Sequence, residues 1–247
     1  MDQPLISIIT VTYNADRVIF KTLQSLKEQT FRDFEHIVID GSSRDNTLQI
    51  IKSFGLPQTK VVSEPDNGLY DAMNKGLRLA KGKYVLFLNA GDIFHDKNTL
   101  SKYSEKANKG FDIIYGDTVI VDSEGKKIAD RHLNVPDTLT KESFADGMLI
   151  CHQAFMVKKE LTSEYNLNYR FSADYDWCVK CISKTQPDKC LNLNRITIDY
   201  LSEGLTDKNK WKSLRERFRI MTTHYGLPKT LTKHLGFILR AIKRSKI

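Results

Sequence analysis

The chain has 247 residues, of which 40% are hydrophobic and 28% are charged, and its formal net charge is +8. This composition excludes a disordered chain, and no apolar run reaches the roughly 18 residues that a membrane-spanning helix needs. The N-terminus lacks the basic segment of a signal peptide, so we expect a cytoplasmic protein.

The positive charge is concentrated near the C-terminus. Residues 207–247 contain 12 Lys or Arg against two Asp or Glu, a local charge of +10, which leaves −2 for residues 1–206. The sequence therefore predicts a nearly neutral body followed by a basic tail.

The first ninety residues alternate between expected strands and expected helices. Strands are predicted at 5–11, 35–39, 60–63 and 84–88, with helices at 16–29, 47–54 and 69–80 between them. Such β-α-β alternation is typical of a parallel sheet with right-handed crossovers. No GxGxxG and no GxxxxGK[ST] motif is present, which disfavours dinucleotide-binding and P-loop folds.

Carboxylates stand at the ends of three of these strands. Asp40, Asp66 and Asp92 each lie in a polar turn after an apolar run, and the carboxyl ends of parallel strands meet at one edge of a sheet. We expect these side chains to gather where a substrate or a metal binds. The alternative is three ordinary turns, because Asn, Gly and Asp are common there.

The pattern changes after Asp92. We expect a helix at 98–108, a strand at 113–121 and a turn at 122–125. Residues 131–146 should form a loop, 151–157 a strand and 174–183 a helix, and 190–200 a strand pair or a loop followed by a strand. No linker separates these parts, so we treat them as one continuous fold.

Four cysteines lie in the second half. Cys178 and Cys181 form a CxxC motif, and with Cys190 they make a zinc site conceivable. The pair lies in a helical segment without a second CxxC, however, so buried reduced thiols are the favoured interpretation.

The tail carries apolar residues at helical spacing among its basic ones: Trp211, Leu214, Phe218 and Met221, then Leu231, Leu235, Ile238, Leu239 and Ile242. A basic amphipathic helix of this kind can lie in a membrane interface, which predicts contact with the inner face of the cell membrane. The alternative is that the apolar face packs on the body. No module for binding nucleic acid is present.

Taken in order, the motifs SIITVTYN, VIDGSSRDNT and SEPDNGLYDAMNKGLRLAKGKYVLFLNAGD, with ICHQAFM and FSADYDW downstream, resemble family 2 glycosyltransferases. The resemblance covers roughly residues 4–205. Within the family, the sequence is most similar to the group that builds bacterial surface polysaccharides. It implies an α/β GT-A fold: a Rossmann-like, mostly parallel central sheet flanked by helices, here with a C-terminal helical extension. Residues 1–100 would form the nucleotide-sugar half, 101–206 the acceptor half and 207–247 the tail.

The resemblance also implies roles for single residues. The nucleotide-diphosphate sugar would be bound by residues from the strand ends and from the start of the helix at 69–80. Thr12 and Tyr13 would lie against the base, and Asp40 would accept from the base or ribose. The full set is Thr12, Tyr13, Asn14, Asp40, Asp66, Asp71, Asn89 and Gly91. His152 and Gln153 would line the acceptor side.

For the metal, Asp92 resembles the last carboxylate of the DxD signature and would hold Mg²⁺ or Mn²⁺, although Asn89 or Ala90 replaces the first acidic position. For catalysis, Asp174 resembles the general base, with Ala173 in place of the usual Glu. Asp176 is the rival, and because the two lie about 200° apart on a helix, only one can face the site.

The implied reaction is inverting transfer of a sugar, with a UDP-sugar favoured as donor, to a hydroxyl of a saccharide or polyisoprenyl-linked acceptor. A nucleotidyltransferase is disfavoured because VTYNADR lacks the glycines of a phosphate loop. The alternative from another class is a catalytically silent nucleotide-sugar-binding or scaffold protein, because the DxD motif is incomplete and the usual Glu is missing.

Overall fold

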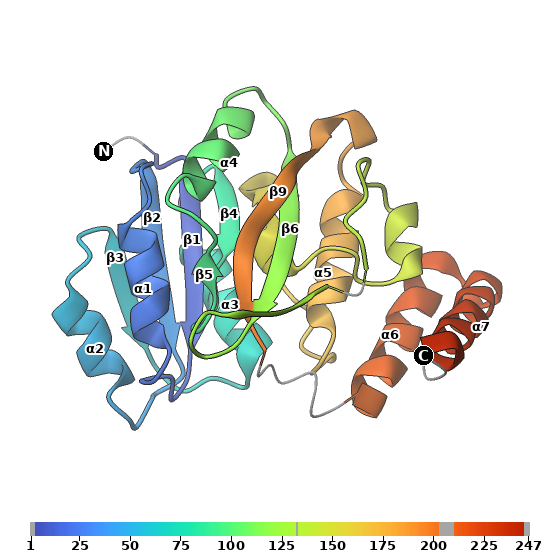
Figure 1. Ribbon diagram of the computed structural model, residues 1–247, viewed down its shortest axis with the longest axis horizontal. Coiled ribbons are helices and arrows are strands. Elements are labelled where there is room, and N and C mark those ends of the chain that lie inside the picture. The colour runs from blue at the N-terminus through green and yellow to red at the C-terminus, as the bar shows by residue number, and fades with distance from the viewer. Residues whose placement is uncertain (1–2, 132, 203–209, 245–247) are drawn as a thin grey trace.

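A computed structural model describes residues 3–131, 133–202 and 210–244, and the side chains of all these except 210 and 238–244. Within these residues, nine strands form one sheet with helices on both faces (Figure 1). Eight of the strands lie in the order β3-β2-β1-β4-β8-β6-β9-β5, and β7 pairs with β6.

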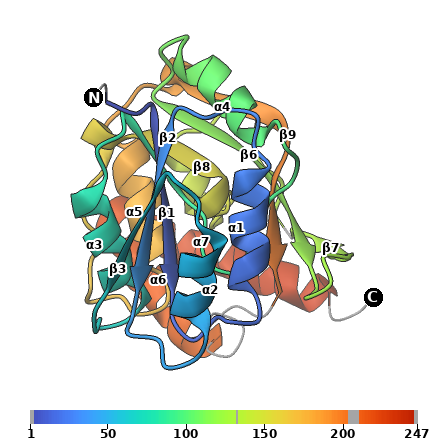
Figure 2. The ribbon, with the colours of Figure 1, turned by 90° about the vertical axis from the view of Figure 1, so that its left-hand side faces the viewer.

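The N-terminal half is a parallel β-α-β arrangement, as the sequence predicts. Its elements are β1 (Ile6–Thr12), α1 (Ile19–Lys27), β2 (Phe34–Asp40), α2 (Thr47–Phe54), β3 (Thr59–Ser63), α3 (Leu69–Leu79) and β4 (Tyr84–Phe87). All seven residues of β1 are buried, because α1 and α2 cover one face of the sheet and α3 covers the other together with α5 (Ala173–Ile182) (Figure 2).

The second half of the sheet is mixed. Antiparallel pairs join β8 to β4 and to β6, and β5 to β9, whereas β6 and β9 are parallel. The remaining elements are β5 (Ile93–Phe94), α4 (Thr99–Ala107), β6 (Ile113–Val121), β7 (Lys127–Asp130) and β8 (Phe155–Lys158), then α5, β9 (Cys190–Leu201) and the 3-10 helices η1 (Glu142–Asp146), η2 (His152–Ala154), η3 (Lys159–Leu161) and η4 (Pro187–Lys189). The GT-A arrangement of a mostly parallel sheet with C-terminal helices is thereby confirmed.

Several expected boundaries were wrong. The strand expected at 151–157 begins only at Phe155, because residues 152–154 turn as η2 to aim polar side chains at the sheet edge. Residues 190–200 belong to one long strand rather than to a pair. The sequence also missed β5, which has two residues, and β7, which is mostly exposed and has little apolar signal.

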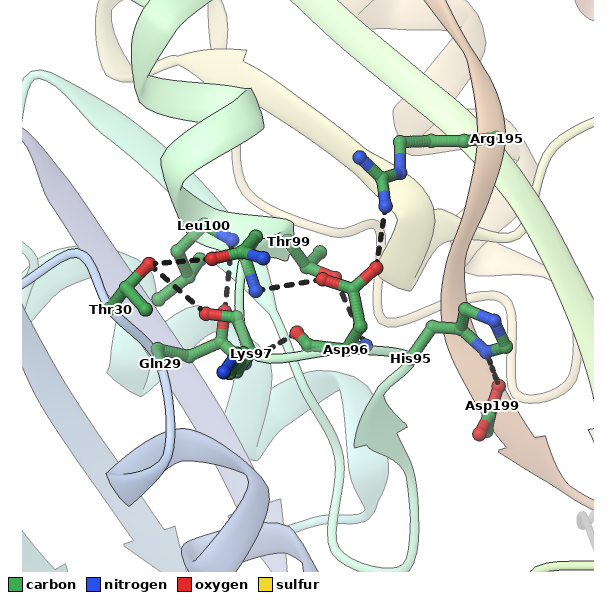
Figure 3. Close-up of polar contacts among 10 residues, drawn as sticks. Gln29, Thr30, His95, Asp96, Lys97, Thr99, Leu100, Arg195 and Asp199 are labelled. Atoms are coloured by element: carbon green, nitrogen blue, oxygen red, sulfur yellow. Dashed lines mark hydrogen bonds and ion pairs between the residues drawn. The ribbon is translucent and has the colours of Figure 1, made fainter.

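A polar network joins the two halves (Figure 3). Gln29, after α1, donates from Nε2 to the carbonyl of Asp96 (2.9 Å) and accepts from the backbone N–H of Leu100 (3.0 Å). The Asp96 carboxylate in turn accepts from Arg195 on β9 at 2.5 Å. Because Gln29 is only 1% exposed, these bonds fix α4 and β9 against the first β-α unit.

The C-terminal helices α6 (Lys210–Tyr225) and α7 (Leu227–Arg244) pack on the body beside α5. Ile220 and Met221 are buried, and the Glu216 carboxylate accepts from the backbone N–H groups of Arg170 (2.9 Å) and Phe171 (2.8 Å). Lys233 pairs with Asp146 of η1 at 2.7 Å. One face of the tail therefore packs on the body. The expectations for residues 207–209 and 245–247, and for the side chains from 238 onward, lie outside the described residues.

All four cysteines are buried free thiols. Burial raises the pKa of Cys151 to about 11 and that of Cys190 to about 12, so these thiols stay protonated at neutral pH. In the described part of the chain, no group of three or more His, Cys, Asp or Glu side chains could hold a metal ion.

Close packing at Gly82 gives a test of this fold. A Cβ there would lie 2.5 Å from the backbone nitrogen of Ser7, in a buried strand that cannot move aside. We expect Gly82→Ala to lower the free energy of unfolding by about 1–3 kcal/mol, measured by urea denaturation. As control, Gly236→Ala meets open space inside α7 and should raise stability by about 0.5–1 kcal/mol. Equal stability of Gly82→Ala and the wild type would contradict the packing.

Candidate functional site

The ends of β1, β2 and β3 meet at one edge of the sheet. Their parallel register aligns Thr12 with Asp40 and Asp40 with Ser63. The turns that follow place Tyr13 and Asp66 side by side next to Gly41. A Cβ added to Gly41 would lie 2.4 Å from Asp66 Oδ2 and 3.3 Å from the Tyr13 ring. Tyr13 is 61% exposed, so the edge offers an open aromatic ring beside a carboxylate oxygen.

Asp40 is fully buried beneath this edge. Its carboxylate accepts from the backbone N–H (3.0 Å) and the hydroxyl (2.5 Å) of Ser43, and from the hydroxyl of Ser63 (2.7 Å). Asp40 thus holds the turns after β2 and β3, and its contact with a base or ribose stays a prediction.

Thr12 and Asn14 stand at the end of β1. Thr12 is 6% exposed, and its buried hydroxyl has no hydrogen-bond partner among the described residues. Asn14 adopts φ 48° and bridges to the β2 turn, since its N–H donates to Ser43 Oγ (2.8 Å) and its Oδ1 accepts from the Arg44 N–H (2.9 Å). This bridge from Asn14 to the turn after β2 fixes the position of Tyr13, which lies between Thr12 and Asn14 in the chain.

The turn before α3 is held by two of the expected donor-binding carboxylates. Asp66 accepts from the N–H of Gly68 and Asp71 accepts from the N–H of Asn67, both at 2.9 Å. Asp71 therefore satisfies an N–H near the start of α3, while Asp66 keeps its other oxygen beside Gly41. A direct contact of Asp71 with the donor stays a prediction.

A second cluster forms around Asp174 in the first turn of α5. The Tyr70 hydroxyl, from the first turn of α3, donates to Asp174 Oδ1 at 3.0 Å. His152 Nδ1, from η2, lies 3.6 Å from Asp174 Oδ2. The Asp174 side chain keeps 23% of its surface exposed, so the carboxylate is held from two sides and open on another.

An aromatic stack supports Tyr70. Its ring stacks on Tyr165 with centroids 5.4 Å apart, and Tyr165 stacks on Trp177 of α5 at 5.2 Å. Phe87, at the end of β4, packs edge-on against both Tyr165 and Trp177. The stack joins α3, α5 and the sheet, and so it sets the distance between Tyr70 and Asp174.

The surroundings keep Asp174 ionised. Burial alone would raise its pKa, but His152, the positive charge of Arg217 and the Tyr70 hydroxyl outweigh burial and leave the pKa below the usual carboxyl value. Burial and the Asp174 charge raise the pKa of Tyr70 well above its usual value, so Tyr70 remains a donor. The cluster presents a carboxylate at neutral pH, as a proton acceptor requires.

Asp176 lies on another face of α5. It is 3% exposed and pairs with His224 Nε2 of α6 (2.7 Å) and with Lys180 Nζ (2.6 Å). These partners outweigh burial and lower its pKa. Asp176 fastens α6 to α5, and among the two candidates only Asp174 joins the Tyr70–His152 cluster.

Asp92 lies beneath the end of β9 and is 4% exposed. Its Oδ1 accepts from the backbone N–H of Leu201 at 2.8 Å, and its Oδ2 accepts from the side-chain amide of Gln153, which is fully buried. Burial raises its pKa to about 7 despite these bonds. Because Asp92 is buried and each of its oxygens accepts a hydrogen bond, the residues present do not fit a divalent ion held by Asp92. Gln153 faces Asp92 rather than an open acceptor side.

Asn89 and Gly91 flank this carboxylate. The Asn89 side-chain nitrogen lies 3.5 Å from His152 Nε2, and its Oδ1 is buried without a hydrogen-bond partner among the described residues. Gly91 adopts φ 101°, and a Cβ there would lie 2.9 Å from the Leu201 side chain. Asn89 thus borders the Asp174 cluster through His152, whereas Gly91 shapes the turn.

Sequence reasoning missed Tyr70 and Arg217. Tyr70 lies in the NGLYDAMNKG segment, whose helical spacing was visible, but only the packing of α3 against α5 brings it to Asp174. Arg217 is one of many basic tail residues, and no sequence signal distinguishes it from Arg215 or Arg219. The docking of α6 decides which of them faces the site.

Comparison with known proteins identifies the family. The model of glycosyl transferase family 2 matches residues 7–165. A PGL/p-HBAD biosynthesis glycosyltransferase of Mycobacterium tuberculosis is 34% identical over 195 residues, covering 74% of this chain and 72% of the relative. The Escherichia coli UDP-Glc:alpha-D-GlcNAc-diphosphoundecaprenol beta-1,3-glucosyltransferase WfgD is 25% identical over 250 residues, covering 99% and 96%.

Solved structures share the fold. S. aureus TarS 1–349 in complex with UDP-GlcNAc superimposes with a TM-score of 0.71 at 20% identity, covering 89% of this chain and 65% of that one. Two other structures of this fold, bound to nucleotide or nucleotide sugar, also contain Mn²⁺. From the matched family model and the extent of the mycobacterial similarity, we conclude that this chain belongs to glycosyl transferase family 2.

Proposed function

We propose that the protein transfers a hexosyl or N-acetylhexosaminyl group, with inversion, from a UDP-sugar to a hydroxyl of a saccharide or lipid-linked saccharide during surface polysaccharide synthesis. The observation that carries the proposal is the partly exposed carboxylate of Asp174, held ionised by Tyr70 and His152. The similarity to WfgD and to the TarS complex supports a UDP-sugar as donor.

The nucleotide would lie at the edge formed by β1, β2 and β3. The exposed Tyr13 ring offers an apolar face for a flat base, and Asp66 Oδ2 beside it can accept from a base N–H. Gly41 leaves room because any side chain there would collide with Asp66. Uracil, with one imide N–H, suits this pair of contacts.

The transfer step follows from the position of Asp174. The acceptor oxygen attacks the anomeric carbon from the face opposite the diphosphate, and the acceptor proton passes to the Asp174 carboxylate. As the new carbon–oxygen bond forms, the bond to the β-phosphate oxygen breaks and its electron pair leaves with UDP. Tyr70 and His152 hold the carboxylate in place and stabilise its charge before the proton arrives.

The proposal contains no metal step. The expected Mg²⁺ or Mn²⁺ would need access to a lone pair of Asp92, but this side chain is buried and each of its oxygens accepts a hydrogen bond, from Gln153 and from Leu201. Asn89 adds no charge at the position where a second carboxylate is usual. The contribution of Asp92 is instead to tie η2 to the end of β9.

The outer face of the tail supports association with a membrane surface. Trp211 is 84% exposed, and Leu231 and Leu235 are 54% and 60% exposed. A groove of about 480 Å³ between α6 and α7 is lined by Trp211, Leu214, Arg215, Phe218, Arg219 and His234. Apolar side chains flanked by cations suit an anionic leaflet. None of the helices in the described residues has the length and hydropathy that crossing a bilayer requires.

Asp174→Asn tests the proposed base. The amide still accepts from Tyr70 but cannot take the acceptor proton, so kcat should fall by about 10²–10⁴-fold while UDP affinity is unchanged. Transfer assays with UDP-, GDP- and dTDP-sugars and calorimetric titration with UDP measure the two effects. Because the pKa of Asp174 is lowered, the wild-type rate should fall only in acid below the usual carboxyl range.

Asp176→Asn is the matched control. It should keep the turnover of the folded protein but unfold at lower urea concentration, because His224 and Lys180 lose their charged partner. Normal turnover by Asp174→Asn would remove Asp174 from the mechanism. A wild-type protein that binds UDP but transfers no sugar would instead be the silent binding protein.

Asp92→Asn tests the metal question. The amide can replace only one of the two accepting oxygens, so the variant should lose about 1–3 kcal/mol of stability in urea denaturation. UDP affinity is measured once with Mn²⁺ and once with EDTA. Any increase in affinity with Mn²⁺ should be the same for Asp92→Asn and for the wild type. A gain that disappears in the variant, with its near-UV circular dichroism intact, would make Asp92 a metal ligand after all.

Vesicle flotation tests the tail. We expect binding to vesicles of phosphatidylcholine with phosphatidylglycerol, weaker binding in high salt, and none to phosphatidylcholine alone. The double variant Trp211→Ser, Leu235→Ser should bind several-fold more weakly, because it removes exposed apolar area from the proposed contact. Leu167→Ser, which alters a 54% exposed leucine on the body, is the control. Equal binding by the double variant and the wild type would refute the tail as the contact.

A further inference from the structure

The inner face of α6 packs on the start of α5. Ser213 Oγ lies 2.9 Å from Ser172 Oγ, Ile220 is fully buried, and His224 pairs with Asp176. Arg217 is four residues after Ser213 and three before Ile220, so it lies on the same face of the helix. Arg217 is therefore directed at the first turn of α5, where Asp174 stands.

The Arg217 guanidinium carries an unused donor. Its Nε is buried and has no hydrogen-bond partner among the described residues. An unpaired buried donor is unfavourable, and a hydrogen bond to an anionic oxygen would relieve it. The positive charge of Arg217 also contributes to the lowered pKa of Asp174, which agrees with a guanidinium on the side of α6 that faces α5.

The place of α6 decides which substrate supplies the anion. β1, β2 and β3, whose ends would hold the nucleotide, lie at one end of the molecule, and α6 lies at the other beyond α5 (Figure 1). An anion at Arg217 would therefore reach Asp174 from the side opposite the nucleotide, which is the side of the acceptor.

The outer face of the same helix suits the rest of such an acceptor. Trp211, Leu214 and Phe218 line the apolar groove between α6 and α7. The helix thus has an apolar groove outside and a cation directed at the site inside. An acceptor with a hydrocarbon chain, a phosphate and a sugar in that order matches both.

We propose that Arg217 binds a phosphate of the acceptor, which makes the acceptor class a saccharide linked to a lipid through phosphate. This inference rests on the proposed function, since it takes Asp174 as the base for that acceptor. Arg217 acts as a specificity-determining residue: it selects acceptors with an anionic group next to the sugar and leaves donor binding to the opposite edge.

Binding of farnesyl diphosphate, compared with farnesol, tests the proposal on the full chain without a transfer assay. The wild type should bind farnesyl diphosphate about tenfold or more tightly than farnesol, measured by calorimetry, because a charge-assisted hydrogen bond to phosphate contributes about 1.5–3 kcal/mol. Arg217→Met should lose that difference and keep its UDP affinity. Arg32→Met, which removes an exposed arginine outside both proposed binding regions, is the matched control and should keep both.

The outcomes are distinct. If Arg217→Met binds farnesyl diphosphate as the wild type does, or loses UDP instead, the proposal is overturned. If the Met variant does not fold, Arg217→Lys, which keeps the positive charge, replaces it in the test. The Lys variant should retain part of the preference for farnesyl diphosphate over farnesol. A Lys variant that loses only its UDP affinity would again overturn the proposal. Arg217-dependent binding in a chain that transfers no sugar would refute the proposed function and leave the phosphate site standing.

Discussion

A carboxylate that stays ionised while mostly removed from water is the feature on which the site depends. Burial favours the neutral acid, so the charge of Asp174 persists only because the Tyr70 hydroxyl, His152 and Arg217 surround it. These groups come from α3, η2 and α6, which are far apart in the sequence. The ionised carboxylate proposed as the base therefore depends on the N-terminal half, the mixed half of the sheet and the C-terminal helices together.

The first of the C-terminal helices, α6, packs directly against α5, the helix that carries Asp174. Asp176, two residues after the proposed base, pairs with His224 and so fastens α6, the helix that carries Arg217, to α5. The inner face of α6 buries Ser213, Ile220 and Met221, whereas its outer face exposes apolar and basic side chains. A single helix thus connects a surface suited to lipid with the group proposed to accept a proton.

Much of this arrangement was predictable from the sequence. The alternation of apolar runs and helical segments indicated β1 to β4 and the gathering of the polar ends of β1 to β3, because parallel strands end at the same edge. The periodicity of α5 indicated that Asp174 and Asp176 face different neighbours. What failed were the segments governed by side-chain contacts: residues 152–154 turn as η2, and β5 and β7 exist only through pairing with β9 and β6.

By itself, the sequence determined the family resemblance, the parallel half of the sheet and the candidate carboxylates, since these depend on local periodicity and on residues near each other in the chain. Only the tertiary structure decided how each carboxylate is used. Asp40 and Asp92 became buried hydrogen-bond acceptors, Asp176 an anchor for α6, and Asp174 the one held by Tyr70 and His152. The reason is that the charge state and accessibility of an acid depend on its neighbours in space, and these come from segments that no local pattern connects.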